Sequence, residues 1–108
     1  MAIDNAPVRI YVTYQGSASA RFDRDLYVNR HLPLVMSLWG KYGLQSARAF
    51  YPASDADGTV AVCECLFRDD AAVEAAFSSP ETPEVMADVA LFTELTPTRF
   101  RAVLLESN

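Results

Sequence analysis

The sequence is poor in the residues that build metal centres, disulfide frameworks and phosphate-binding loops. Its 108 residues include one histidine, two cysteines and four glycines. One residue stands between Cys63 and Cys65. On a strand the two side chains would therefore share a face about 6.6 Å from each other, at the far limit of disulfide geometry. We expect two free thiols in a reduced compartment and no metal site, because cysteine and histidine are too few to close a zinc site. The glycines all occupy expected turns or helix ends, which disfavours a nucleotide cofactor.

Basic residues are also few. Nine Lys and Arg face fourteen Asp and Glu, giving a formal charge of −5. This balance argues against nucleic acid or an anionic membrane as a partner. No segment approaches the roughly 20 apolar residues of a membrane span, and the N-terminal residues lack the pattern of a signal peptide. We therefore expect a cytoplasmic protein.

What is present suffices for one domain over residues 1–108, since 51% of the residues are hydrophobic. Alternation and turn residues predict strands at 8–16, 44–53, 59–68 and 98–106. Helical periodicity and caps predict a helix that starts between Ser19 and Asp23 and closes at Gly40 to Gly43, and two helical pieces at 69–79 and 83–95. The order strand, helix, strand, strand, helix, strand predicts an α+β, ferredoxin-like βαββαβ sandwich, an antiparallel sheet with the helices on one face.

Two of the predicted strands are apolar on both faces. Val60 and Val62 alternate with Cys63 and Cys65, and the last strand does the same with Ala102, Val103, Leu104 and Leu105. A sheet covered by helices on one face has to bury an apolar second face elsewhere. We therefore expect a homodimer in which two sheets face each other.

The segment 22–43, "FDRDLYVNRHLPLVMSLWGKYG", holds the single histidine and the single tryptophan. Pro33 lacks a backbone donor and disfavours helical geometry at the preceding residue, so we expect a kink or restart near residues 31–33. The carbonyls freed there are possible partners for His31 as a plain core residue. Asp23, Tyr27 and His31 are spaced by four, which predicts a polar stripe on one helix face.

Part of this segment, "FDRDLYVNRHLPLV", resembles the EthD family, named for ethyl tert-butyl ether degradation. The matching positions are Phe22, Tyr27, His31, Pro33 and Leu34, and the length and order of elements agree over nearly the whole chain. The resemblance implies a dimeric α+β barrel, in which the sheets of two subunits close into a shared barrel with the helices outside. Proteins of that architecture include monooxygenases without metal or flavin, cyclases, isomerases and haem-degrading enzymes.

His31 and Tyr27 are the candidate catalytic residues. A neutral imidazole in an apolar pocket is a base near neutral pH, and a nearby carboxylate would shift it towards the charged acid. A tyrosine one turn away could hold a substrate carbonyl or phenol oxygen as charge develops on it. The pair suits proton abstraction beside a carbonyl, and hence cyclisation, isomerisation, dehydration or delivery of an aromatic anion to oxygen.

Candidate substrate-binding residues come from the helix end and the strands: Tyr14, Trp39, Arg48 and Cys63. Tyr11 and Tyr14 fall on opposite faces of the first strand, and we favour Tyr14 because it ends an apolar run. Trp39 could form the pocket wall, and Cys63 could donate a proton from it. Arg48 could hold a substrate carboxylate, although pairing with an acid such as Glu64 is the structural alternative.

These observations favour a small-molecule enzyme of degradative or secondary metabolism that needs no cofactor and acts on an apolar or aromatic substrate. Two alternatives stay open. One is a non-catalytic binder or accessory protein of the same fold, and the other is a haem-binding protein with His31 as axial ligand. A flavin has no positive indication.

Overall fold

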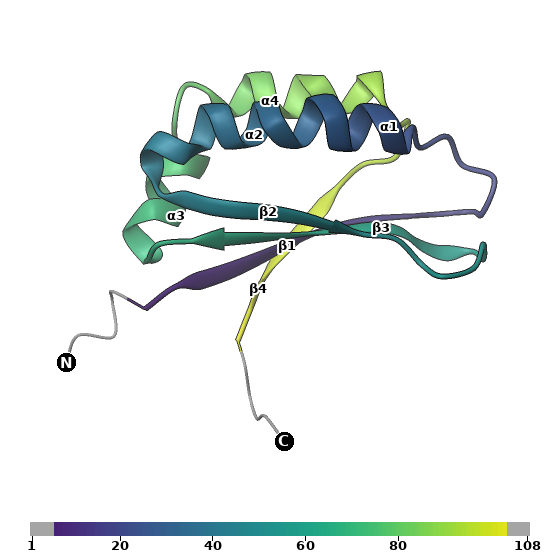
Figure 1. The fold of residues 1–108 in the computed structure, drawn as a ribbon, viewed down its shortest axis with the longest axis horizontal. Helices are drawn as coiled ribbons and strands as arrows, with labels where there is room; N and C mark the ends of the chain where they lie inside the picture. The colour runs from purple at the N-terminus through teal and green to yellow at the C-terminus, as the bar shows by residue number, and fades with distance from the viewer. Residues whose placement is uncertain (1–5, 104–108) are drawn as a thin grey trace.

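The computed structural model describes residues 6–103 and shows a single antiparallel sheet with all helices on one of its faces (Figure 1). The strand order is β2-β3-β1-β4, and every neighbouring pair is antiparallel. The strands are β1 (Val8–Gly16), β2 (Leu44–Phe50), β3 (Gly58–Phe67) and β4 (Thr98–Ala102). This is the ferredoxin-like topology that the order of predicted elements indicates.

The helical layer consists of two long segments broken into short pieces. The first comprises α1 (Arg24–Leu26), the π turn η2 (Tyr27–His31), α2 (Leu32–Trp39) and η3 (Gly40–Tyr42). The second comprises α3 (Asp70–Phe77), α4 (Thr82–Asp88) and η4 (Val89–Leu91). In Figure 1, α2 and α4 run side by side above the sheet, and they are in contact. Within residues 6–103 no helix is long and apolar enough to cross a membrane.

The expected interruption of the first helix is confirmed, and it takes the form of a π turn. The N–H of Leu32 donates to the carbonyl of Tyr27, five residues back, and α2 starts afresh with Pro33 near its first turn. Proline fits there because donors of a first turn have no helical partner. Asp23 caps the start of α1 by accepting from the N–H of Leu26 at 3.1 Å.

Gly43 fixes how the first helical segment joins the sheet. Its φ of +118° is left-handed, a conformation that favours glycine. A Cβ placed on Gly43 would lie 2.5 Å from the Cβ of Ala72 on α3. The chain therefore turns from η3 into β2 through a position that admits no side chain.

The two faces of the sheet differ in composition. The inner face, towards the helices, carries the core residues Ile10, Tyr14, Ala61, Cys63, Cys65 and Phe67. The outer face carries Tyr11 and Phe100, stacked with ring centres 5.6 Å apart, together with Val60, Val62 and Glu64. Phe100 is 54% exposed. The outer face thus presents apolar side chains, as the alternation of residues along the third predicted strand indicates. Leu104 and Leu105, expected to extend the last strand, lie outside the described residues.

Candidate active site

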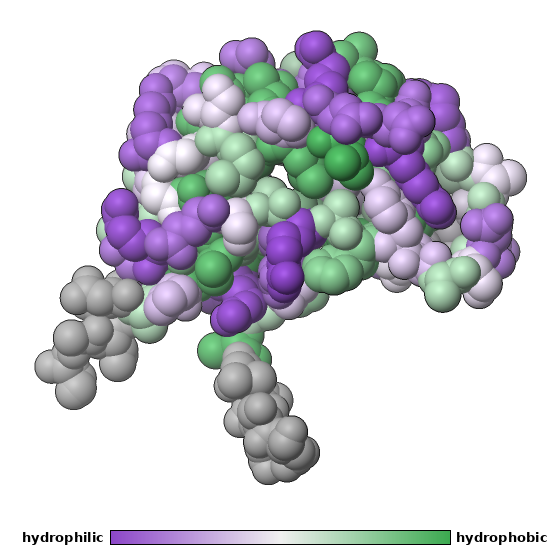
Figure 2. Space-filling view, in the orientation of Figure 1, coloured by the Kyte–Doolittle hydropathy of each residue, from purple (hydrophilic) through white to green (hydrophobic). Residues whose placement is uncertain are grey.

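A cavity of about 240 Å³ lies between the sheet and the helical layer. Its wall is mainly aliphatic and aromatic, with contributions from β1, β3, β4, the π turn, α2, α3, α4 and η4. Figure 2 shows the surface hollowed between the helices and the sheet, with mostly apolar residues around the hollow. The wall includes Tyr14, Tyr27, His31, Trp39 and Cys63. Five of the residues singled out in the sequence therefore meet at one place.

The π turn places Tyr27 and His31 on the cavity side of the helix. Residues at a spacing of four, Tyr27, His31, Val35 and Trp39, are all buried. The wider π turn brings residues four apart closer to one line than an α-helix does. The rings of Tyr27 and His31 accordingly stack, with centres 5.5 Å apart and planes 18° from parallel.

His31 is held by a carboxylate on the other helical segment. Its Nδ1 lies 2.9 Å from Oδ2 of Asp88, and the two side chains are only 6% and 5% exposed. The other oxygen of Asp88 accepts from Nε of Arg30 at 3.0 Å. The sequence suggested backbone carbonyls freed by Pro33 as partners of His31, and that suggestion is wrong. The carboxylate fixes the proton on Nδ1 and leaves Nε2 as the acceptor.

Burial and pairing set the charges of this pair. Burial lowers the pKa of His31 below 6.5, and the hydrogen bond with Asp88 offsets this only in part. Burial disfavours the charge on Asp88, yet the hydrogen bonds from His31 and Arg30 outweigh it and lower the pKa of that carboxyl. At neutral pH the pair is thus a neutral imidazole against a carboxylate. Such a pair accepts a proton at Nε2 and stabilises the imidazolium that results.

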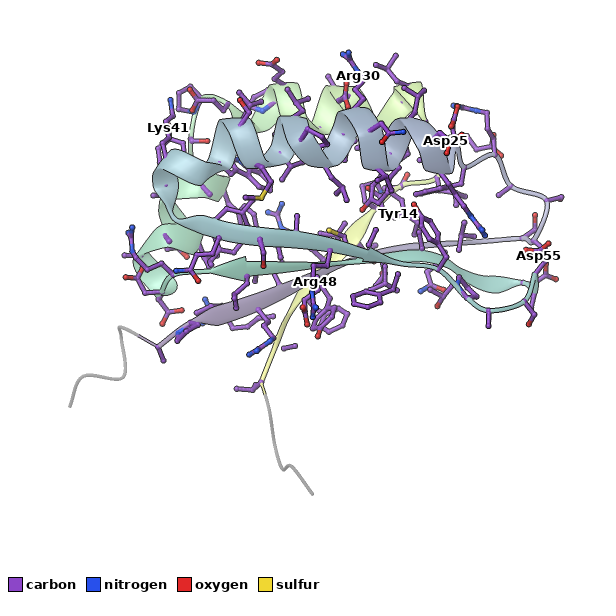
Figure 3. All side chains as sticks on the ribbon, viewed as in Figure 1. Tyr14, Asp25, Arg30, Lys41, Arg48 and Asp55 are labelled. Carbon is purple, nitrogen blue, oxygen red and sulfur yellow. The ribbon has the colours of Figure 1, made fainter. Side chains whose placement is uncertain are left out.

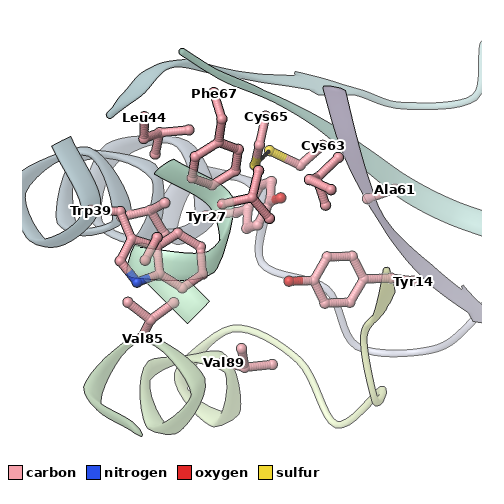
Figure 4. Packing of buried hydrophobic residues seen from close by; sticks show 14 of the residues in the cluster. Tyr14, Tyr27, Trp39, Leu44, Ala61, Cys63, Cys65, Phe67, Val85 and Val89 are labelled. Atoms are coloured by element: carbon pink, nitrogen blue, oxygen red, sulfur yellow. Dashed lines mark hydrogen bonds between the residues drawn. The ribbon is translucent and has the colours of Figure 1, made fainter. Parts of the chain in front are cut away.

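Two tyrosines and two thiols form the wall next to His31. In Figure 4 the hydroxyl of Tyr14 points into the space bordered by Tyr27 and Val89, and the sulfurs of Cys63 and Cys65 lie together beside Tyr27. Those sulfurs are 3.8 Å apart and both thiols are free, as expected. Burial raises the pKa of both tyrosines. They remain protonated donors at any ordinary pH.

The pKa values of the two thiols shift in opposite directions. Hydrogen bonds from Cys65 and Tyr27 lower the pKa of Cys63, although burial opposes this. The same bond to Cys63, together with burial, raises the pKa of Cys65. Cys63 is therefore the sulfur of the pair that more readily carries negative charge.

Trp39 lies further along α2 and presents only its ring to the cavity. Its indole N–H donates to the hydroxyl of Thr82 at 3.3 Å. The ring packs edge-on against Phe77, with centres 5.2 Å apart. The ring of Trp39 is therefore part of the apolar cavity wall, and its single polar group is already hydrogen-bonded to Thr82.

The structure does not bring Arg48 or Asp23 into the cavity. Arg48 points away from the helices, on the outer face of the sheet (Figure 3), and donates to Glu64 at 2.8 Å. Tyr11 donates to the same carboxylate at 2.6 Å, so Tyr11 and Tyr14 do face opposite ways. A register shift between Leu44 and Ser46 explains Arg48, because strict alternation from the buried Leu44 would have turned it inward. The predicted polar stripe thus consists of Tyr27 and His31 only, since Asp23 caps the helix.

Asp88 is the site residue that the sequence did not single out. It is 57 positions from its partner His31. One sequence signal was available, because Asp88 stands three residues after Val85 and four before Phe92, on the apolar face of the second helical segment. An acid on an apolar face needs a partner, and the single histidine was the obvious choice.

Comparison with known proteins shows which solved structures share this fold. No family model matches the sequence, and no curated protein matches it. Among solved structures, an EthD-like protein from Ralstonia eutropha JMP134 aligns with a TM-score of 0.79 at 23% identity, covering 96% of each chain. A variant of SnoaB, a cofactor-independent oxygenase from Streptomyces nogalater, aligns with a TM-score of 0.65 at 10% identity, over 94% of this chain and 95% of that one.

A third structure is a dimeric ferredoxin-like protein of unknown function from Jannaschia sp. CCS1. It aligns with a TM-score of 0.61 at 13% identity, over 92% of this chain and all of the other. All three cover nearly the full length of the described chain, so the likeness concerns the entire domain and not one motif. The expected fold is confirmed: this chain has the ferredoxin-like α+β fold of the EthD-like proteins.

Proposed function

We propose that the protein is an EthD-family enzyme that uses His31 as a base on a small apolar or aromatic substrate. The observation that carries the proposal is the buried hydrogen bond between His31 and Asp88 at the wall of an apolar cavity. A buried histidine held through Nδ1 by a carboxylate is the arrangement by which enzymes keep Nε2 poised to take a proton. The likeness to a cofactor-independent oxygenase supports chemistry done by side chains alone.

In this proposal the substrate presents an acidic C–H or phenolic O–H to Nε2 of His31. The imidazole takes the proton, and Asp88 stabilises the charge that the ring acquires. The electron pair of a C–H bond moves to the neighbouring carbonyl oxygen, and that of a phenolic O–H stays on the phenol oxygen. Tyr14 and Tyr27, both protonated and both at the cavity wall, donate hydrogen bonds to that oxygen.

The outer face of the sheet supports a second part of the proposal, self-association. Phe50 and Phe100 are about half exposed there, and Phe100 stacks on Tyr11. Apolar side chains gathered on one face of a sheet indicate an interaction surface. A neighbouring structure of the same fold is described as dimeric. We propose that two copies of this chain pair through their sheets.

A probe reaction tests the base without knowledge of the natural substrate. The compound 5-nitrobenzisoxazole is small and apolar, and it opens to a coloured phenolate when a base removes the proton on C3 of its isoxazole ring. The electrons of that C–H bond form a nitrile as the N–O bond breaks. We expect the wild-type protein to accelerate this opening, and His31→Gln to lose about 100-fold of that rate or more. Glutamine can still donate to Asp88, so the variant preserves the hydrogen bond and removes only the base.

One control variant accompanies the probe reaction, and three outcomes would count against the proposal. Arg24→Gln alters a surface cation outside the cavity and should leave the rate unchanged. An unchanged rate in His31→Gln would rule out His31 as the base, and binding of the probe without acceleration by the wild type would favour the non-catalytic binder. An absorbance spectrum of the purified protein with a Soret band would instead support the haem-binding alternative.

A further inference from the structure

The aromatic rings of the core form two separate clusters, and both contribute to the cavity wall. The first contains Tyr14, Phe22, Tyr27, His31, Tyr51 and Phe92. The second contains Trp39, Phe67 and Phe77. Among residues 6–103 no ring contact joins them, and the cavity wall includes members of both. His31 and Trp39 are eight residues apart on one helix, or about 12 Å at the helical rise.

Arg99 lines the cavity beside the second cluster. It stands on the inner face of the edge strand β4, opposite Val12 of β1, and belongs to the cavity wall. Its guanidinium carbon lies 4.0 Å from the ring centre of Phe77, a member of the second cluster. A guanidinium at this distance from a ring face is held by a cation–π contact and keeps its N–H donors for another partner.

Among residues 6–103, Arg99 also lacks the acidic partner that most of the cations have. A carboxylate lies within 4.0 Å of each of the following: Arg9, Arg21, Arg30, Arg48, Arg68, Arg101 and Lys41. Within the described residues, Arg24 and Arg99 have none. Arg24 stacks on Tyr51 at 4.6 Å and does not line this cavity. Arg99 is therefore the described cation that is both unpaired and in contact with the cavity.

We propose that Arg99 binds an anionic group of the ligand, so that the site takes an apolar or aromatic carboxylic acid. Its carboxylate lies at Arg99 and its reacting group lies at His31. The second half rests on the proposed function, whereas the first needs only that the cavity binds a ligand. Guanidinium and carboxylate match as a two-pronged pair. The chain carries a formal charge of −5, which repels anions in general, so capture of one requires a local cation such as this.

The size of the cavity limits the hydrocarbon part of the acid. A cavity of about 150 Å³ is enough to bind benzene. The 240 Å³ found here fits a body of one ring or two fused rings. Because Arg99 stacks on a ring of the second cluster and His31 belongs to the first, the proposal calls for an acid whose carboxylate and reacting group lie on different sides of that body.

A matched pair of probes separates charge from shape. We would titrate the protein with 2-naphthoate and with 2-naphthamide, which share a two-ring body and differ in charge. Trp39, the single tryptophan, lies in the cavity wall and reports binding through its fluorescence. We expect the wild type to bind the naphthoate at least about tenfold more tightly than the amide. Arg99→Gln should remove this preference and leave the affinity for the amide within about twofold.

Control variants test whether Arg99 alone causes the preference for the naphthoate. Arg24→Gln, a second unpaired arginine stacked on a ring, should retain the full preference. Arg99→Lys should retain part of it, and serves if Arg99→Gln fails to fold. His31→Gln should retain the preference, so failure of His31 as a base does not affect this readout. Equal affinity of the wild type for both probes, a preference that survives in Arg99→Gln, or no binding of either probe up to about 1 mM overturns the proposal.

Discussion

The carboxylate of Asp88 and the imidazole of His31 meet at 2.9 Å, across 57 residues of sequence and between two separate helical segments. The contact is buried, and it connects the π turn to the end of α4. A hydrogen bond of this kind can be measured directly, because His31 is the single histidine of the chain and gives one imidazole signal in NMR spectra.

Asp88→Asn should lower the pKa of His31 further below its wild-type value. Burial already lowers it, and the carboxylate is the group that raises it. Removing the negative charge removes the raising influence and leaves the burial. A pH titration of the imidazole Hε1 resonance measures the change. A pKa equal to or above the wild-type value would show that Asp88 does not stabilise the charged ring.

The free energy of unfolding should fall as the pH drops below 6.5. The unfolded histidine takes up a proton near that pH, whereas the folded His31, with its lowered pKa, does not. In the window between the folded pKa and 6.5 the unfolded state therefore binds more protons, and stability decreases with falling pH by up to about 1.4 kcal/mol per unit. Above 6.5 this contribution is constant.

Urea unfolding at pH 7.5 and pH 5.5 measures this loss, with His31→Gln as the reference. The variant lacks the titrating group but shares every other acid and base of the chain. We expect the wild type to lose more stability than the variant between the two pH values. A loss of the same size in both proteins would assign the effect to other groups.

Alanine at the glycine positions should separate steric contact from backbone strain. Gly43→Ala combines a φ of +118° with a Cβ 2.5 Å from that of Ala72, and should cost about 2 to 4 kcal/mol. Gly58→Ala has a φ of +121° but open space around it, and should cost about 1 kcal/mol. Gly40→Ala, in helical geometry with open space, should be neutral or stabilising. Denaturant midpoints of the three variants measure these changes in stability. Equal losses of stability in Gly43→Ala and Gly58→Ala would show that contact with Ala72 plays no part.

Charge on the outer face of the sheet should weaken self-association. Phe100→Asp places a carboxylate among the apolar side chains proposed to pair two copies. Leu91→Asp is the matched control, because Leu91 is 51% exposed against 54% for Phe100 but lies in the helical layer. Sedimentation velocity should show a wild-type dimer, a largely monomeric Phe100→Asp and an unaffected Leu91→Asp. A wild type that sediments as a monomer at high concentration would contradict the proposed pairing.

Periodicity and turn residues were sufficient to predict the topology and several residues of the cavity wall. Alternation along β1 separates Tyr14 from Tyr11, and spacing along the first helix joins Tyr27 to His31. These are local relationships, set by the geometry of one element. For Arg48 the structure shows the pairing with Glu64 that the sequence offered as the alternative to substrate binding. The irregular register in β2 that turns Arg48 outward leaves no mark in the sequence.

Asp88 shows a different kind of limit. Its role depends on how two helical segments pack side by side, which no local pattern encodes. Arg99 illustrates the same point, since its place at the cavity follows from the position of β4 at the edge of the sheet. The sequence thus provides the members of each face, and the packing of the faces decides which of them meet.

The π turn also has a consequence for the history and redesign of the site. A π turn is in effect an α-helical turn with one residue added. Deleting the exposed Asn29 would bring Tyr27 and Leu32 to the four-residue spacing of an α-helical hydrogen bond, so a regular turn would replace the π turn with little rotation of the helix on either side. Tyr27 and His31 would then be three residues apart instead of four. A single codon therefore separates the π turn that stacks Tyr27 on His31 from a regular α-helical turn.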